Sequence, residues 1–110
     1  MPVKLGTVNT FANPKADKPQ ALKVLEESAE VFSAWQAVDK CTDYYDGYQC
    51  SMYDGGTCDA RTDCSYVQAL VDEIADTIQA CANLAAALGV DDMREAMSEC
   101  EERNRARGRL

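Results

Sequence analysis

Hydrophobic positions between residues 17 and 38 recur at the spacing of an α-helix. At about 100° per residue, one face carries Leu22, Leu25, Ala29 and Phe32, with Trp35 on its flank. Asp17 precedes this pattern and can cap the helix, and Pro19 is tolerated in a first turn because its missing N–H is not needed there. The pattern therefore predicts a first long helix over residues 17–38.

A second helix is predicted from Ser65 or Tyr66 to Gly89, which is a suitable left-handed stop. Its broad apolar face contains Val67, Leu70, Val71, Ile74, Ile78, Cys81, Leu84, Ala85 and Leu88. A third helix is predicted from the Asp91-Asp92 cap into the basic segment 103–109. No stretch has the pattern of a strand, so the predicted fold class is all-α.

The chain is predicted to form a single domain over residues 1–110, with an irregular arm over 1–16 that packs on the body. Residues 40–65 form a long connection rich in Cys, Tyr and Asp. Two helices of about 23 residues are some 35 Å long, and three helices cannot cover the apolar surface described. We therefore expect antiparallel helices in a four-helix-bundle-type core that a second copy completes, giving a homodimer or homotetramer.

Charge and composition exclude several classes of function. A net charge of −8 argues against nucleic acid as a partner, because no excess of positive charge is present to neutralise phosphates. The chain has no histidine, which removes Ser-His and Cys-His nucleophile pairs and imidazole bases. No apolar run is long enough for a membrane span, and residues 1–12 do not resemble a signal peptide, so a cytoplasmic protein is expected.

Two acidic pairs carry the candidate chemistry. Glu27 with Glu30, and Glu73 with Asp76, are each spaced i, i+3, so each pair can point at one spot between two facing helices. Mg²⁺ prefers oxygen ligands and commonly bridges carboxylates to substrate phosphates, and Mn²⁺ is an acceptable substitute. The ordinary alternative is a solvated helix face, which is what most such pairs are.

Glu26 and Asp72 lie to the side of the direction in which these two pairs point, so they are not among the four expected ligands. Asp72 is still close enough in angle to Asp76 to serve as an outer ligand.

Several other residues are candidates for binding a substrate, each with a structural alternative. Lys23 lies on the face of Glu27 and either reaches a phosphate or forms an ordinary i, i+4 salt bridge. Trp35 either stacks on a base or belongs to the core or to a subunit interface. Asn83 lies two turns beyond Asp76 on the acidic face and could reach a sugar or base.

Four cysteines in the connection could form a thiolate zinc site: Cys41, Cys50, Cys58 and Cys64. Their spacing lacks a C-x-x-C pair, so a plain reduced loop is the favoured interpretation. Cys81 and Cys100 lie on apolar helix faces and are interpreted as small core residues.

Three segments together resemble the MazG-like nucleotide pyrophosphohydrolases of the all-α NTP pyrophosphatase superfamily. The matching pieces are KVLEESAE over residues 23–30, EIADT over 73–77 and RNRARGR over 103–109. The resemblance implies an E-x-x-E and an E-x-x-D motif that hold Mg²⁺, with Glu27, Glu30, Glu73 and Asp76 as ligands. It also favours Asn104 and Arg107 as substrate contacts.

The resemblance implies a hydrolase that cuts nucleoside or deoxynucleoside triphosphates to the monophosphate and pyrophosphate. Two alternatives stay open. The chain could be a non-catalytic helical interaction protein whose acids keep it in solution, or a metal or redox module centred on the loop cysteines.

Overall fold

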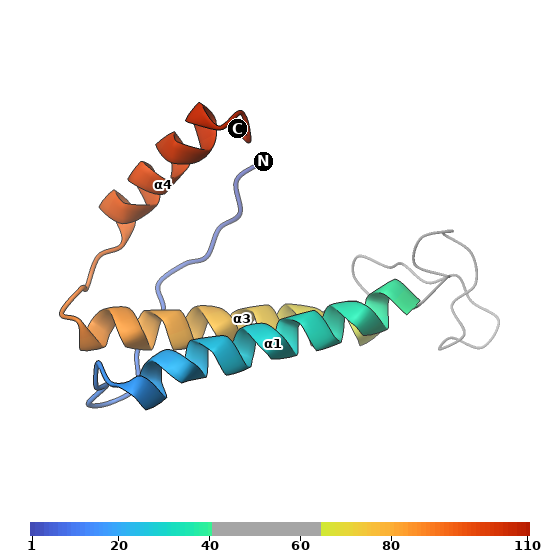
Figure 1. Cartoon of the computed structure of the whole chain (residues 1–110), viewed down its shortest axis with the longest axis horizontal. Coiled ribbons are helices and arrows are strands. Elements are labelled where there is room, and N and C mark those ends of the chain that lie inside the picture. Colours follow the sequence, from blue (N-terminus) through green and yellow to red (C-terminus); the bar gives the residue numbers. More distant parts are fainter. Residues whose placement is uncertain (41–64) are drawn as a thin grey trace.

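Three helices make up the described part of the chain. The computed structural model describes residues 1–40 and 65–110, with α1 at Lys18–Lys40, α3 at Ser65–Ala87 and α4 at Arg94–Ala106. Helices α1 and α3 lie side by side and run in opposite directions (Figure 1). No strand occurs in either described range, and the all-α prediction is confirmed at that level.

The start of α1 agrees with the capping pattern in the sequence. The backbone N–H of Gln20 donates to Asp17 Oδ1 at 3.1 Å, which satisfies one of the free donors of the first turn. Pro19 is the second residue of the helix, where no intrahelical N–H is required. Asp17 is therefore the cap that fixes where α1 begins.

Gly89 is the left-handed stop of α3, as predicted, and the last helical residue is Ala87. Gly89 adopts a φ of 81°, and its N–H donates to Ala86 O while the N–H of Val90 donates to Ala85 O, both at 2.9 Å. This pair of bonds is the Schellman arrangement, and it needs a residue that tolerates positive φ. Gly89 therefore ends α3 and redirects the chain toward α4.

The start of α4 differs in detail from the predicted Asp91-Asp92 cap. Met93 occupies the N-cap position and makes no side-chain capping bond. Asp92 instead accepts hydrogen bonds from the Arg94 backbone and guanidinium at 2.7–3.1 Å. Arg94 also lowers the pKa of Asp92 to about 2. The Asp92 carboxylate thus forms an ion pair with the first arginine of the helix and also accepts a hydrogen bond from its backbone N–H.

The α1–α3 interface uses a face of α1 other than the predicted apolar stripe. Its buried and half-buried residues follow a seven-residue repeat, with Val24, Glu27, Val31, Ala34 and Val38 from α1 and Leu70, Glu73, Thr77, Ala80 and Leu84 from α3. Of the described hydrophobic side chains, only Val38 and Ala80 are fully buried. Small residues in the repeat let the helices approach closely, and two glutamates lie within the interface.

The predicted stripe of α1 faces away from α3. Leu25 is 65% exposed and Phe32 is 58% exposed, and Leu22 is also exposed. Trp35 stacks on Phe32 with ring centroids 5.7 Å apart. This stripe therefore does not contribute to the α1–α3 interface of the single chain. It belongs to an outer surface of the chain.

The N-terminal arm is irregular, as predicted, and it is tied to α3. Gln79 Nε2 donates to the backbone O of Asn9 at 2.9 Å, and the N–H of Phe11 donates to Asn83 Oδ1 at 3.0 Å. Gln79 also donates to Asn83 Oδ1 at 3.1 Å. Asn83 is only 3% exposed, so its amide oxygen is an interior anchor for the arm.

Helix α4 stands apart from the helix pair. Within the described chain it packs against neither α1 nor α3, and it rises away from them (Figure 1). Among the helices described, none combines the length and apolar character that a membrane span requires.

Candidate metal centre

Three of the four predicted ligands converge between α1 and α3. Glu27, Glu30 and Glu73 each place a carboxylate oxygen within 4.8 Å of the other two. Glu27 and Glu30 lie one turn apart on α1, and Glu73 projects from the inner face of α3, so antiparallel pairing brings them to one point. The described residues thus contain a group of carboxylates that could hold a metal ion.

The three carboxylates differ in their exposure to solvent. The Glu27 side chain is 11% exposed and lies in the helix interface, whereas Glu30 is exposed at its edge. Glu73 is half-buried, and its Oε2 atom is buried without a hydrogen-bond partner among the described residues. A buried polar atom without a partner is unfavourable, and a bound cation would supply the missing interaction. The donor set, all carboxylate oxygen, fits a hard cation.

The neighbouring carboxylates shift the pKa of Glu30. Contact with Glu27, by hydrogen bond and by charge, raises the pKa of Glu30 above its ordinary value, and Glu73 adds to the effect. Like charges held this close disfavour ionisation unless a cation neutralises them. The group therefore has an electrostatic reason to bind a cation.

Lys23 is the cationic side chain paired with this group. Its Nζ lies 3.1 Å from Glu27 Oε1 and 3.6 Å from Glu26 Oε2. These carboxylates, Glu27 first, raise the pKa of the Lys23 ammonium above its ordinary value. Glu26, which we placed to the side of the centre, pairs with Lys23 instead of joining the three-carboxylate group.

Asp76 is exposed and does not belong to the three-carboxylate group. It lies three residues beyond Glu73 on α3, so it is one turn from the centre on the solvent side. The structure thus brings together Glu27, Glu30 and Glu73 and leaves Asp76 outside. An exposed carboxylate at this distance can hold a water molecule beside the centre.

Two predicted substrate contacts on the long helices have other neighbours. Asn83 is buried, and its amide oxygen accepts hydrogen bonds from Phe11 and Gln79. Trp35 stacks on Phe32, and it lies about 140° around α1 from Glu30 because the two are five residues apart. Within one chain, neither side chain is directed at the carboxylate group.

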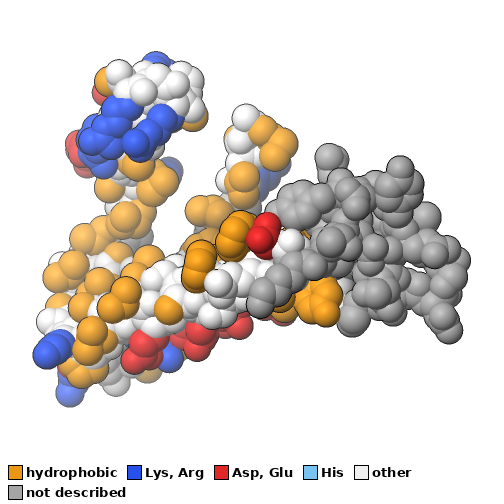
Figure 2. Space-filling view, turned by 45° about the vertical axis from the view of Figure 1, so that its right-hand side comes forward, with side chains coloured by type: hydrophobic (Ala, Val, Ile, Leu, Met, Phe, Trp, Pro, Cys, Tyr) orange, Lys and Arg blue, Asp and Glu red, His pale blue; other side chains and the backbone are white. Residues whose placement is uncertain are grey.

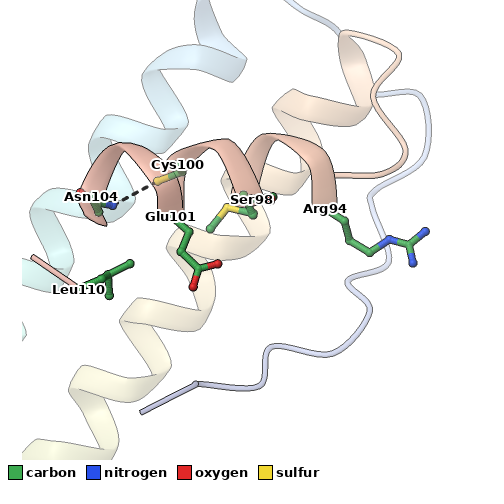
Figure 3. Close-up of a pocket in the computed structure, with 7 residues that line it drawn as sticks. Arg94, Ser98, Cys100, Glu101, Asn104 and Leu110 are labelled. Carbon is green, nitrogen blue, oxygen red and sulfur yellow. Dashed lines mark hydrogen bonds between the residues drawn. The ribbon is translucent and has the colours of Figure 1, made fainter. Parts of the chain in front are cut away.

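The predicted contacts in the C-terminal segment lie on α4. Asn104 Nδ2 donates to Cys100 Sγ at 3.5 Å, and Asn104 Oδ1 accepts from Arg109 Nη1 at 3.3 Å. Arg107 is the C-cap of the helix. Asn104 also lines an open hollow with Arg94, Ser98, Cys100, Glu101 and Leu110 (Figure 3). This hollow is formed by α4 and the residues that follow it.

The arginines of α4 and the carboxylate group of the helix pair lie in different parts of the described chain. Figure 2 shows acidic side chains along one edge of the helix pair and a group of basic side chains on α4, which makes no contact with α1 or α3. One chain therefore does not bring the predicted Asn104 and Arg107 contacts to the carboxylates.

The cysteine predictions have mixed outcomes. The proposed zinc ligands Cys41, Cys50, Cys58 and Cys64 lie outside the described residues. Cys100 is half-buried, but Cys81 is exposed, so its assignment to the core is wrong for the single chain.

The sequence predicted Glu73 as a ligand but not the burial of its Oε2 atom. It also did not predict that Gln79 and Asn83 hold the N-terminal arm. For Glu73 the available signal was the seven-residue repeat through Leu70, Glu73 and Thr77, which places this glutamate among interface positions of α3. Gln79 carried no such signal, because its partner is a backbone oxygen of the arm.

Comparison of the chain with protein-family models, with curated proteins and with solved structures gives no match. The assignment of a function therefore rests on the geometry described above and on the resemblance of the three sequence segments.

Proposed function

We propose that this protein is a Mg²⁺-dependent nucleotide pyrophosphohydrolase that converts nucleoside or deoxynucleoside triphosphates to the monophosphate and pyrophosphate. The observation that carries the proposal is the convergence of Glu27, Glu30 and Glu73, one of which, Glu73, has a buried oxygen without a hydrogen-bond partner among the described residues. The order of the acidic motifs and their setting on two paired helices agree with the family that the sequence resembles. Carboxylate oxygens are the ligands that Mg²⁺ prefers.

In this proposal each acidic residue has a defined role. Glu27, Glu30 and Glu73 hold the metal, which neutralises phosphate charge and polarises the phosphoryl group when bound. Asp76 lies outside the three-carboxylate group and is exposed, so it is free to orient water and accept its proton. The water oxygen forms a bond to the α-phosphorus, the bond from that phosphorus to the bridging oxygen breaks, and pyrophosphate leaves.

The direct test is a panel of all common NTPs and dNTPs with Mg²⁺, in which pyrophosphate and orthophosphate are measured separately. We expect pyrophosphate and a nucleoside monophosphate in equal amounts. Glu30→Gln and Asp76→Asn should abolish turnover without unfolding the protein, because each removes a functional charge from a solvent-exposed position. Glu102→Gln, an exposed acid on α4, is the matched control and should retain activity.

Two results would overturn this function. One is the release of orthophosphate alone, which indicates cleavage of a different bond. The other is unchanged turnover in both Glu30→Gln and Asp76→Asn.

We further propose that the functional unit contains at least two copies. The apolar residues Leu22, Leu25 and Phe32 on α1 and Val71 and Ile74 on α3 are exposed in the single chain. Two such helix pairs would bury this surface in a four-helix core. A second copy could also bring its α4 arginines near the carboxylates, which the single chain does not do.

The exposed apolar side chains also favour a second candidate, a non-catalytic helical interaction protein. Contiguous exposed apolar surface is typical of binding sites for other proteins. The two functions differ in their metal dependence: the interaction protein should bind its partner equally well with Mg²⁺ or with a chelator, and it should release no pyrophosphate.

A further inference from the structure

Lys23 is already a counter-ion to one member of the carboxylate group, Glu27. Its ammonium lies 3.1 Å from Glu27 Oε1, and the Glu27 side chain is 11% exposed. We propose that Lys23 is a built-in competitor for the metal ion, and that metal binding displaces its ammonium toward the phosphates of the substrate. This inference rests on the proposed function, because it concerns the same metal centre.

The burial of Glu27 distinguishes this contact from an ordinary surface ion pair. An exposed i, i+4 pair contributes only tenths of a kcal/mol, because water screens both charges. Glu27 is largely withdrawn from water, so removal of its cationic partner leaves a poorly compensated negative charge. Lys23 therefore stabilises the metal-free state, and a divalent ion must replace that stabilisation.

Repulsion and reach together explain why Lys23 would move. A divalent ion held by Glu27 repels an ammonium held by the same carboxylate. The Lys23 side chain is 55% exposed and has a flexible four-carbon stem, so it can turn into solvent without disturbing the helix interface. Substrate phosphates at the metal would then offer a new anionic partner within reach of the released ammonium.

Competition and phosphate binding predict opposite effects of one substitution. Lys23→Met should tighten Mg²⁺ binding in the absence of nucleotide, because the competing charge is gone. The same variant should weaken binding of phosphates to the Mg²⁺-loaded protein. A salt bridge with a purely structural role would give neither tighter metal binding nor weaker phosphate binding.

The test is calorimetric titration with Mg²⁺ alone, followed by titration of the Mg²⁺-loaded protein with inorganic pyrophosphate. We expect Lys23→Met to bind Mg²⁺ about fivefold more tightly than the wild type and pyrophosphate about fivefold more weakly. Lys18→Met is the matched control: it removes the same charge from the same helix and should change neither value. Lys23→Arg keeps the charge and should stay within about twofold of the wild type for Mg²⁺.

The outcomes separate this inference from the proposed function. If the wild type binds Mg²⁺ and Lys23→Met binds it equally or more weakly, Lys23 is not a competitor and only this inference fails. If neither protein binds Mg²⁺, the metal centre itself is wrong and both proposals fall. Circular dichroism of each variant should show wild-type helix content. If Lys23→Met is unfolded, the Lys23→Arg result decides, and altered Mg²⁺ affinity in that variant rejects the competition.

Discussion

Glu73 is the residue whose surroundings most directly indicate a missing partner. Its Oε2 is buried without a hydrogen bond from any described residue, beside two other carboxylates. A buried polar group without a partner costs about 1–3 kcal/mol, more when it is charged. A cation at the centre would remove that cost, so the metal-free protein should be less stable than the metal-bound protein.

We therefore predict that Mg²⁺ stabilises the wild type and not Glu73→Gln. At a concentration of 100 times its dissociation constant, a ligand adds about 2.7 kcal/mol to the free energy of unfolding. Without metal, Glu73→Gln should be as stable as the wild type or more stable, because it removes repulsion from the group. Urea unfolding with and without Mg²⁺ measures both effects, and Glu102→Gln should respond to Mg²⁺ like the wild type. An equal gain in Glu73→Gln would contradict the ligand role.

The raised pKa of Glu30 predicts how metal-free stability depends on pH. Because the folded-state pKa lies above the ordinary value of 4.5, the native state binds more protons than the unfolded state in the interval between the two. The Glu30 contribution to stability therefore falls as pH rises from 4.5 through the raised value. The difference in unfolding free energy between wild type and Glu30→Gln, measured in urea from pH 4.5 to 7 with a chelator, should change in that direction. A difference that does not change with pH would show that the folded-state pKa of Glu30 is not raised.

At the scale of the helices, the sequence predicted where each long helix ends better than it predicted which face it buries. Asp17 fixes the start of α1 and Gly89 fixes the end of α3, each through local hydrogen bonds or backbone geometry that the residue type predicts. The face was ambiguous because α1 carries two apolar stripes, one through Leu25 and Phe32 and one through Val31 and Val38. In the single chain the second stripe is the one that lies in the interface with α3, and Val38 is buried there.

The candidate site was predictable to a similar extent. The i, i+3 spacing placed Glu27 and Glu30 on one face, and the structure brings Glu73 to them. The spacing did not reveal that Asp76 lies outside the group, because the position of Asp76 depends on how α3 is rotated about its axis. Rotation is set by packing over the whole interface, which local spacing does not determine.

Asn83 links two elements, and its removal should loosen the arm. Asn83→Ala leaves the Phe11 N–H without its acceptor, so we predict a loss of about 1–3 kcal/mol in unfolding free energy. Gln79→Ala, which removes a more exposed bond to the arm, should lose less. Urea unfolding gives the energies, and hydrogen exchange at the Phe11 amide should become faster in Asn83→Ala. Unchanged exchange would show that Asn83 does not hold the arm.

At the scale of the whole molecule, the described helix pair exposes apolar side chains on its outer surface. Within the described chain, Leu25, Phe32 and Val71 are more than two-fifths exposed. Apolar burial contributes about 25 cal/mol for each Å² removed from water, so covering this surface is favourable. A second copy presents the same surface and can form a symmetric interface.

We predict that Phe32→Glu shifts the protein toward monomer. Two buried carboxylates facing each other across a symmetric interface would be strongly unfavourable. Ala69→Glu introduces the same charge at an exposed position of α3 away from this surface and should leave the assembly intact. Sedimentation velocity over a range of protein concentrations gives the mass of each. A monomeric wild type would contradict the proposed assembly, as would a Phe32→Glu variant with the wild-type mass.

The contact between the arm and α3 has a kinetic consequence. Phe11 and Asn83 lie 72 positions apart in the chain, so their hydrogen bond closes a very long loop. Such a bond is expected to form after the helices have docked, because the docked pair first brings its two partners together. Loss of the bond should then leave the refolding rate almost unchanged and accelerate unfolding, as expected for an interaction absent from the transition state. We therefore expect the arm to dock last during folding and to slow the unfolding of the helix pair.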